Sequence, residues 1–295
     1  MKEVKDIKNI LIIGCGTLGL RIGLRCALDG YTVRMYDISD TILQRALATQ
    51  EKLLNSFIKK GMVTAQQADA AKARISTTTD QEKAVKDIDL VSESVTEDLE
   101  LKKKVYQSFA PLFEKHTIVT TNTSYLLSSM LAEDSGCAER FCAFHFHDVF
   151  LMNVVDIMPH PNTEGWVAEL LMDFGKAINQ IPVYIKNENY GYIFNQMLLA
   201  LLGSAGDLVT REVSSIQDVD RSWMGNTKMQ IGPYGIMDQI GLDTAWHVVK
   251  TRTDKKSLRF AELLKSYVDA GKLGIKTGEG FYKYPNPEFT QVDFI

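Results

Sequence analysis

Residues 10–37 read ILIIGCGTLGLRIGLRCALDGYTVRMYD. A short apolar run, Ile10–Ile13, leads into a cluster of glycines, residues 20–29 have the pattern of a helix, and Thr32–Tyr36 is a second β-rich run. This order of strand, turn, helix and strand within about 30 residues is the first unit of a parallel sheet. Parallel strands need such a crossover, and it is right-handed in nearly all proteins. The sequence therefore predicts an α/β fold for the first part of the chain.

The glycines have the spacing G-x-G-x-x-G, at Gly14, Gly16 and Gly19. The first glycine of this motif permits a tight turn, the second lets the backbone approach a pyrophosphate, and the third lets the helix pack on the strand. Thr17 and Leu18 begin the predicted helix, whose free N–H groups attract phosphate. The motif is weak alone, but here it follows a predicted strand and opens a predicted helix. We therefore predict that residues 14–19 bind the pyrophosphate of a dinucleotide.

Asp37 ends the second predicted strand, 23 residues after Gly14. A carboxylate at this place accepts hydrogen bonds from the ribose hydroxyls of NAD, and it repels the extra phosphate of NADP. The alternative is a set of turn glycines and a helix-capping aspartate without a ligand. The first strand, the glycine motif, the helix and Asp37 all have the spacing expected of a dinucleotide site, so the sequence predicts NAD as the cofactor.

The rest of the first part alternates between helical and strand patterns. Apolar residues fall at helical spacing from Asp40 to Lys60, and Thr64 with Gln67 forms a capping box for another helix, which together predict a helical hairpin. A further helix is predicted over residues 99–112. The remaining predicted strands are residues 88–91, 117–121, 141–146, 154–158 and 183–185.

The pattern changes near Asn187, after which helical periodicity prevails. Helices are predicted over residues 193–202, after a capping Ser215, over residues 235–250 and over residues 257–270. We therefore expect two domains, a Rossmann domain with an inserted helical hairpin over residues 1–187 and an all-α domain over residues 188–295.

Composition excludes several classes of protein. The chain has 295 residues, of which 45% are hydrophobic and 24% charged, and its net charge is -4. This balance argues against a protein that binds nucleic acid or a membrane surface. The four cysteines form no C-x-x-C pair and have no histidine at zinc spacing, so we predict reduced thiols, no metal and a cytoplasmic location. Neither a signal peptide nor an apolar run of membrane-spanning length is expected.

Several later segments carry specific motifs. Residues 93–102 read ESVTEDLELK, residues 118–124 read IVTTNTS, and residues 276–282 read KTGEGFY, while Gly232-Pro233, Asp238 and Gly241-Leu242-Asp243 lie between the last two. In this order they resemble the motifs of the L-3-hydroxyacyl-CoA dehydrogenases, over about residues 8–284. The resemblance implies a Rossmann domain with a helical insertion, a helical dimerisation domain, and reversible oxidation of the 3-hydroxyl of an acyl-CoA by NAD.

The resemblance also implies a set of site residues. The family's general base, its orienting carboxylate and two polar residues near the substrate oxygens correspond to His145, Asp156, Ser124 and Asn195. Its cofactor contacts include Glu97, Lys102 and Asn122, and its basic contact to CoA corresponds to Lys60. Imidazole suits the role of base at neutral pH, and a carboxylate on its far nitrogen fixes the tautomer. Ser124 and Asn195 would hold the reacting oxygen in place.

Each of these assignments has a structural alternative. His145 could be a satisfied core histidine, Ser124 could cap a following helix, and Lys59 with Lys60 could simply suit a helix C-terminus. The other histidines, His116, His147, His160 and His247, have no matching context and are interpreted as structural.

The segment after His145 departs from the family pattern. Where the family reads H-F-F-N-P-V-P and ends with Glu, this chain reads HFHDVF over residues 145–150, is one residue shorter, and has Asp156 as its acid. The serine that precedes the basic CoA contact corresponds to Leu53. The substrate end of the site is thus less typical of the family than the cofactor end.

Three alternative functions remain. The chain could oxidise a 3-hydroxy acid without CoA, such as a sugar acid or a carnitine-like molecule, or it could bind NAD without turnover. Ser124, His145 and Asp156 also follow the order of a hydrolase triad, but no G-x-S-x-G motif is present. A homodimer is expected from the resemblance alone, since the apolar helical faces could also pack within a monomer.

Overall fold

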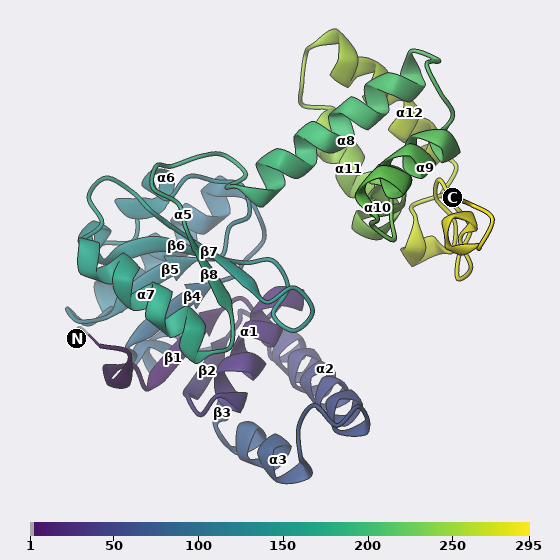
Figure 1. The fold of residues 1–295 in the computed structure, drawn as a ribbon. Coiled ribbons are helices and arrows are strands. Elements are labelled where there is room, and N and C mark those ends of the chain that lie inside the picture. The colour runs from purple at the N-terminus through teal and green to yellow at the C-terminus, as the bar shows by residue number, and fades with distance from the viewer. Residues whose placement is uncertain (1–2) are drawn as a thin grey trace. The chain divides into compact units, whose positions relative to one another are not determined.

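The computed structural model describes residues 3–295. The chain forms two compact units, one ending at Ile193 and the other running over Phe194–Ile295 (Figure 1). Within the described residues, no helix is both long enough and apolar enough to cross a membrane.

The first unit is built on one sheet of eight strands in the order β3-β2-β1-β4-β5-β6-β7-β8. All neighbouring strands pair in parallel except β6 and β7, which pair antiparallel. The strands are β1 (Asn9–Ile13), β2 (Thr32–Tyr36), β3 (Ile75–Thr78), β4 (Leu90–Glu93), β5 (Ile118–Thr121), β6 (Phe141–Phe146), β7 (Val154–Pro159) and β8 (Ile181–Tyr184). A Rossmann-like α/β unit was predicted and is confirmed.

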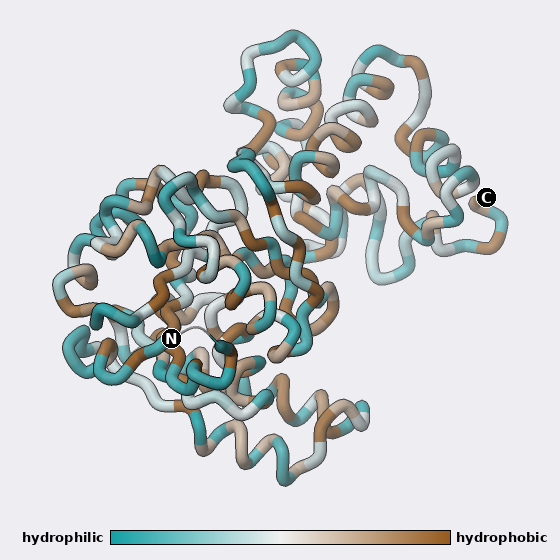
Figure 2. Tube along the Cα trace, turned by 60° about the vertical axis from the view of Figure 1, so that its left-hand side comes forward, coloured by the Kyte–Doolittle hydropathy of each residue, from teal (hydrophilic) through white to brown (hydrophobic). Residues whose placement is uncertain are grey.

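Helices cover both faces of this sheet. Apolar residues of α1 (Thr17–Leu28) and α7 (Gly165–Ala177) pack in one cluster with one face of the strands. A second cluster joins the opposite face to α4 (Gln81–Val85), α5 (Leu99–Phe109) and α6 (Ser129–Ala132). Central strands are therefore buried on both sides, which explains the continuous apolar run Ile10–Ile13 of β1. Figure 2 shows these apolar segments in brown in the interior of the unit.

The predicted helical hairpin consists of α2 (Asp40–Lys59) and α3 (Ala65–Ala73), and Thr64 and Gln67 form the expected capping box. The hairpin packs on α1 through a small cluster that includes Leu24, Leu54 and Phe57. After α3 the chain forms β3, an edge strand that the sequence analysis did not predict. Its sequence, ISTT, has too few apolar residues to give a strand pattern, because its central residues are exposed at the edge of the sheet.

The second unit is helical, as predicted. It contains α8 (Phe194–Thr210), α9 (Ile216–Thr227), α10 (Pro233–Ile240), α11 (Leu242–Val249) and α12 (Lys255–Asp269). The single helix predicted over residues 235–250 was wrong, because the chain breaks at Gly241, whose φ of +100° does not fit a helix. Asp220 and Asp238 are buried and accept backbone N–H groups from α10 and from the segment around Phe281.

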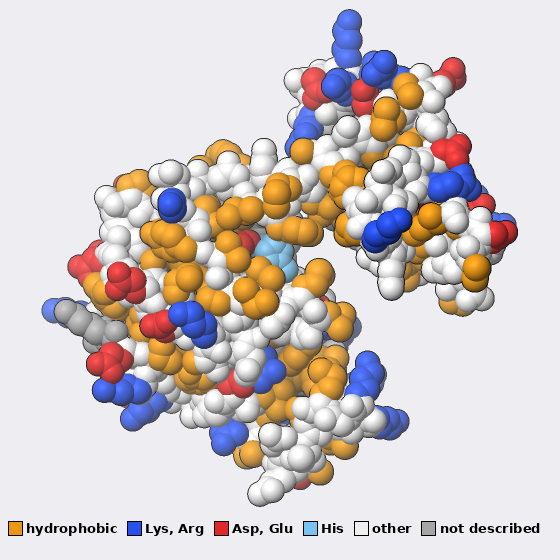
Figure 3. Space-filling view, viewed as in Figure 1, with side chains coloured by type: hydrophobic (Ala, Val, Ile, Leu, Met, Phe, Trp, Pro, Cys, Tyr) orange, Lys and Arg blue, Asp and Glu red, His pale blue; other side chains and the backbone are white. Residues whose placement is uncertain are grey.

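The surface carries charges of both signs. In Figure 3, the Lys and Arg side chains and the Asp and Glu side chains lie interspersed over the face shown. This distribution agrees with the small net charge of -4.

Candidate active site

The candidate site lies where the parallel strands end. Register pairs Ile13 with Glu93, Glu93 with Thr121, and Thr121 with Ala143, so the carboxyl ends of β1, β4, β5 and β6 lie at one edge of the sheet. The loops that leave this edge carry the glycine cluster, Asn122 to Ser124, and His147. In open α/β sheets ligands bind at this edge.

Two glycines of the loop are required by close packing. A Cβ on Gly14 would lie 2.8 Å from the backbone of Ser94, and Gly14 has a φ of +92°. A Cβ on Gly19 would lie 2.0 Å from the carbonyl oxygen of Gly14. The turn and the first turn of α1 therefore pack tightly on each other and on the end of β4.

Gly16 differs from these two glycines, because a Cβ there would have nothing within 4 Å. It is the N-cap of α1, which begins at Thr17, so the open space lies at a helix N-terminus. Asp37 closes the loop: its Oδ2 accepts the N–H of Cys15 at 2.8 Å, and its Oδ1 accepts the N–H of Ile38 at 2.8 Å. Open backbone, free helix N–H groups and a fixed carboxylate fit the pyrophosphate and the ribose of a dinucleotide.

His145 and Asp156 lie directly opposite each other in the antiparallel pair of β6 and β7. His145 Nδ1 is 3.2 Å from Asp156 Oδ2, and the residues are 4% and 2% exposed. The register of two strands, rather than loop geometry, thus sets the contact. The shorter segment between them and the shorter acid do not prevent it.

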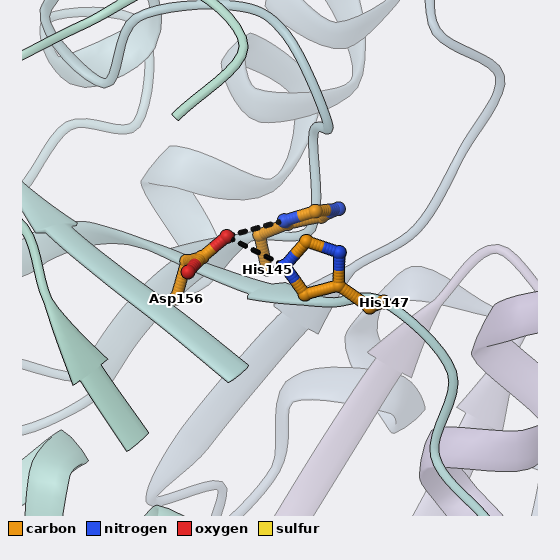
Figure 4. A group of neighbouring side chains, drawn as sticks. All are labelled: His145, His147 and Asp156. Atoms are coloured by element: carbon orange, nitrogen blue, oxygen red, sulfur yellow. Dashed lines mark hydrogen bonds and ion pairs between the residues drawn. The ribbon is translucent and has the colours of Figure 1, made fainter. Parts of the chain in front are cut away.

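A third side chain joins this pair. His147 Nε2 lies 2.8 Å from the same Asp156 Oδ2, so both imidazole rings are directed at one oxygen atom (Figure 4). His147 follows β6 by one residue and lies two residues after His145. Alternate residues of an extended chain share a face, so this spacing was the signal in the sequence that could have identified His147. From the sequence alone His147 was interpreted as structural, and this contact was not predicted.

Burial and contacts determine the charges of the pair. Burial is the largest influence on His145 and lowers its pKa, although the contact with Asp156 acts in the opposite direction. Burial alone would raise the pKa of Asp156, but its contacts with His145 and His147 outweigh burial and lower that pKa. At neutral pH this leaves a neutral imidazole beside an ionised carboxylate. Because the carboxylate only accepts, Nδ1 of His145 carries the proton and Nε2 is the acceptor.

The turn after β5 is held by two side chains. Asn122 Oδ1 accepts the N–H of Phe146 at 2.8 Å, which ties the end of β5 to the strand residue next to His145. Glu97 Oε1 accepts the N–H of Ser124 at 3.0 Å and also accepts from the Thr123 hydroxyl. Ser124 itself is exposed. The next helix, α6, has Ser128 as its N-cap, so Ser124 does not cap it.

Lys102 was expected at the cofactor, and its side chain is 1% exposed. Its Nζ lies 2.7 Å from Glu93 Oε1, 3.2 Å from the carbonyl oxygen of Val95 and 3.5 Å from Glu97 Oε2. Glu93 is fully buried and also accepts from Tyr106 and Thr121. In this structure Lys102 therefore holds the two glutamates in place. Glu93, the centre of this network, was not predicted from the sequence as a site residue.

Two further predicted site residues, Lys60 and Asn195, belong to other elements than the residues described above. Lys60 is the exposed C-cap residue of α2, in the helical hairpin. Asn195 is the second residue of α8, in the helical unit.

The loop between β6 and β7 is fastened to α1. Asp148 accepts two hydrogen bonds from Arg21 Nη2, at 3.0 and 2.9 Å, and it also accepts the N–H groups of Phe150 and Leu151. The Arg21 guanidinium lies 5.6 Å from the centre of the Phe150 ring. This ion pair links the loop beside His147 to the helix that begins at the glycine turn, and the sequence analysis did not predict it.

Comparison with known proteins covers nearly the whole chain. Residues 9–188 match the domain described as "3-hydroxyacyl-CoA dehydrogenase, NAD binding domain", and residues 191–284 match "3-hydroxyacyl-CoA dehydrogenase, C-terminal domain". The mitochondrial hydroxyacyl-coenzyme A dehydrogenase of Sus scrofa is 31% identical over 290 residues, which cover 94% of this chain and 91% of that protein.

Relatives of other named activity are similar to the same degree. The 5-formyl-3-hydroxy-2-methylpyridine 4-carboxylate 5-dehydrogenase of Mesorhizobium japonicum is 31% identical, over 97% of this chain and 93% of that protein. A solved structure of a diketoreductase, described as acting on dicarbonyl compounds, is 35% identical with a TM-score of 0.89, and covers 94% of this chain and 99% of that one.

Proposed function

This chain belongs to the 3-hydroxyacyl-CoA dehydrogenase family, and from that premise we propose that it oxidises the 3-hydroxyl of a 3-hydroxyacyl-CoA to the 3-ketoacyl-CoA, reversibly. The observation that carries the proposal is the buried contact of 3.2 Å between His145 Nδ1 and Asp156 Oδ2. That contact leaves the other ring nitrogen of His145 as a proton acceptor next to the edge of the sheet where ligands bind.

His145 acts as the general base in this proposal. Its Nε2 removes the hydroxyl proton as hydride leaves C3, and it returns the proton in the reverse direction. Asp156 keeps Nδ1 protonated and stabilises the imidazolium that forms. NAD, when bound, supplies the hydride acceptor. Since the base must be neutral before the reaction, burial of His145 favours the oxidation by keeping the ring uncharged.

The cofactor is held by the glycine turn and by Asp37. Thr17 and Leu18 supply N–H groups of the first turn of α1 to the pyrophosphate, and Asp37 binds the ribose. Glu97 and Asn122 shape the turn beside this place, as their contacts with Ser124 and Phe146 support. Lys102 acts through Glu97, as their distance of 3.5 Å supports.

The substrate contacts belong to the same proposal. Ser124 and Asn195 hydrogen-bond the reacting oxygen and hold it for transfer. The exposed ammonium of Lys60 meets a phosphate of CoA. A homodimer formed through the helical unit is also part of this proposal, and exposed apolar side chains there, such as Met197, Val213 and Leu258, support it.

A second candidate is the same chemistry on a carbonyl compound without CoA. It is supported by the similarity to the diketoreductase and to the pyridine-carboxylate dehydrogenase, which equals or exceeds that to the acyl-CoA enzyme. The chain's own departure at residues 147–150, where Asp148 is paired with Arg21, lies beside the base and is consistent with a different substrate.

The first experiment measures NADH oxidation with acetoacetyl-CoA, with free acetoacetate and with ethyl acetoacetate. Turnover of the thioester, lost in His145→Ala while NADH still binds, would support the first candidate. Turnover of the acid or ester alone, with the same dependence on His145, would replace it with the second. NADH binding without turnover of any of the three would contradict both and favour a protein that binds the dinucleotide without reaction.

A further inference from the structure

Three potential metal ligands meet at one point beside the base. His145 Nδ1 and His147 Nε2 lie 3.2 and 2.8 Å from Asp156 Oδ2 (Figure 4). The three ligand atoms all lie within 4.8 Å of one another. Across residues 3–295, no other group of three or more His, Cys, Asp or Glu side chains meets in this way.

The spacing of these atoms matches a small coordination shell. In a tetrahedral zinc site with bonds of about 2.0–2.1 Å, neighbouring ligand atoms are about 3.3 Å apart. The two contacts with Asp156 Oδ2, at 3.2 and 2.8 Å, need to open only slightly to admit an ion, and the two imidazole nitrogens lie within 4.8 Å of each other. Two imidazole nitrogens and one carboxylate oxygen are also ligands that zinc and cobalt favour, whereas magnesium and calcium prefer oxygen alone.

The protein holds these ligands firmly and leaves them accessible on one side. His145 and Asp156 are fixed by the register of β6 and β7, at 4% and 2% side-chain exposure. His147 lies just beyond the strand and its side chain is 10% exposed, so it is the most solvent-exposed member of the group. Asp156 brings one negative charge, so the ligand set compensates half the charge of a divalent cation.

We propose that His145, His147 and Asp156 bind a divalent transition metal ion of the zinc class, with a fourth position open to water. Neutral imidazole carries one proton. An ion on Nδ1 of His145 therefore forces that proton to Nε2, and an ion on Nε2 of His147 forces the other ring's proton to Nδ1. His145 then has no free nitrogen with which to accept a proton. The bound ion thus inhibits the dehydrogenase, a consequence that rests on the proposed function.

Binding is tested without any substrate. Protein treated with a chelator and desalted is titrated with Co²⁺, and the visible absorption of four-coordinate cobalt is recorded; Zn²⁺ is then added to displace it. We expect saturation at one ion per chain. His147→Phe should weaken Co²⁺ binding at least about ten-fold, since removing even a supporting neighbour of a metal ligand has that effect.

The matched control is His116→Phe. His116 also lies between two carboxylates, at 3.5 Å from Asp89 and 3.4 Å from Glu114, but its side chain is 41% exposed. Its replacement should leave Co²⁺ binding unchanged. No cobalt band in the wild type, or equal affinity in His147→Phe and wild type, would overturn the proposal.

Two further measurements keep the test decisive if His147→Phe does not fold. Asp156→Asn removes the charge at constant size and should weaken Co²⁺ binding as well. In the wild type, Zn²⁺ should shift the histidine ring proton NMR signals of two histidines, which single His→Gln variants assign to positions 145 and 147. Shifts confined to the other histidines would place the ion elsewhere and contradict the proposal.

Activity is measured separately, so the two proposals can fail independently. With a working substrate, Zn²⁺ should inhibit the wild type reversibly, EDTA should restore it, and the inhibition should weaken in His147→Phe. Cobalt binding by a protein that turns over no substrate would retain the metal site and overturn the proposed function. Turnover that Zn²⁺ does not affect, in a protein that shows no cobalt band, would retain the proposed function and overturn the metal site.

Discussion

Asp156 is the residue on which the candidate site depends most directly. One of its oxygens, Oδ2, contacts both His145 and His147, and the residue is 2% exposed. Buried carboxylates are stable as anions only when they are hydrogen-bonded, and here the two histidines satisfy that need. The lowered pKa of Asp156, in which these contacts outweigh burial, reflects the same arrangement.

Replacing Asp156 by Asn should therefore impair catalysis without impairing cofactor binding. The amide can donate to Nδ1 of His145, which moves the ring proton to Nε2 and blocks the base. We expect kcat to fall by about 10²–10⁴, the range in which loss of an orienting carboxylate acts in related chemistry. NADH affinity, measured by fluorescence titration, should stay within about two-fold. A kcat close to that of the wild type would contradict the role given to this carboxylate.

At the scale of elements, the glycines in the turn between β1 and α1 have different roles, because one is needed for packing and another faces open space. Gly19 packs on Gly14, so a Cβ there would lie 2.0 Å from a backbone oxygen, whereas a Cβ on Gly16 would have open space. Gly16 has a φ of -66°, which alanine adopts without strain.

Gly19→Ala and Gly16→Ala form a matched pair. Gly19→Ala should destabilise the fold by about 1–3 kcal/mol or more, because backbone has to move. Gly16→Ala should leave the Tm unchanged but weaken NADH binding at least about ten-fold, or about 1.4 kcal/mol, since the methyl occupies the place of the pyrophosphate. Thermal unfolding and NADH titration of both variants check this. Equal Tm losses, or unchanged NADH affinity in Gly16→Ala, would count against the cofactor site.

The loop between β6 and β7 depends on the ion pair of Arg21 and Asp148, whose side chains are 19% and 21% exposed. Burial tends to raise the pKa of Asp148, but the N–H groups of Leu151 and Phe150 and the Arg21 guanidinium lower it overall. A carboxyl whose pKa is lower in the folded state stabilises the fold above its unfolded pKa, which is about 3.9. That stability is lost as the pH falls through the folded pKa.

Asp148→Asn should therefore lower the Tm at pH 7, and the difference from the wild type should narrow as the pH falls below about 4. Thermal unfolding of both proteins between pH 7 and pH 3.5 measures this difference. A gap that widened towards acid pH would show that the charge of Asp148 does not support the loop.

At the scale of the whole molecule, the cysteines distinguish the two units. Cys15, Cys26, Cys137 and Cys142 all lie in the first unit and are buried, at most 3% exposed. Burial also raises the pKa of each of these thiols, which lowers their reactivity in the folded protein. Reaction of the thiols therefore reports the unfolding of the first unit, where the dinucleotide is proposed to bind.

NADH should protect these thiols against urea. At a free concentration of about one hundred times its Kd, a ligand adds about 2.7 kcal/mol to the stability of the unit that binds it. The urea midpoint for thiol reaction should rise accordingly, and Gly16→Ala should lose most of this rise. A midpoint that does not respond to saturating NADH would contradict a cofactor site built within the first unit.

The boundary between the two units depends on tertiary packing as well as on the local sequence pattern. The boundary predicted from the sequence lies near Asn187, and the compact units divide after Ile193. Tyr192 explains the difference: it is 1% exposed and packs with Ala143, Met158 and Ile185 of the first unit. Tyr190 and Tyr192 are alternate tyrosines of the same turn, but Tyr190 is exposed, so the sequence pattern did not indicate which of the two is buried.

Local patterns in the chain were sufficient for the parallel strands, the glycine turn and most helices, because strand, turn and helix preferences act over a few residues. The edge strand β3 and the break at Gly241 were missed, because exposure at a sheet edge and close packing decide them. The contact of His145 with Asp156 was expected only by resemblance, and its direct cause is the register of β6 and β7. Only the tertiary structure decided two other contacts, that of His147 with Asp156 and that of Arg21 with Asp148. The reason is that pairing across strands and loops depends on how the whole unit folds.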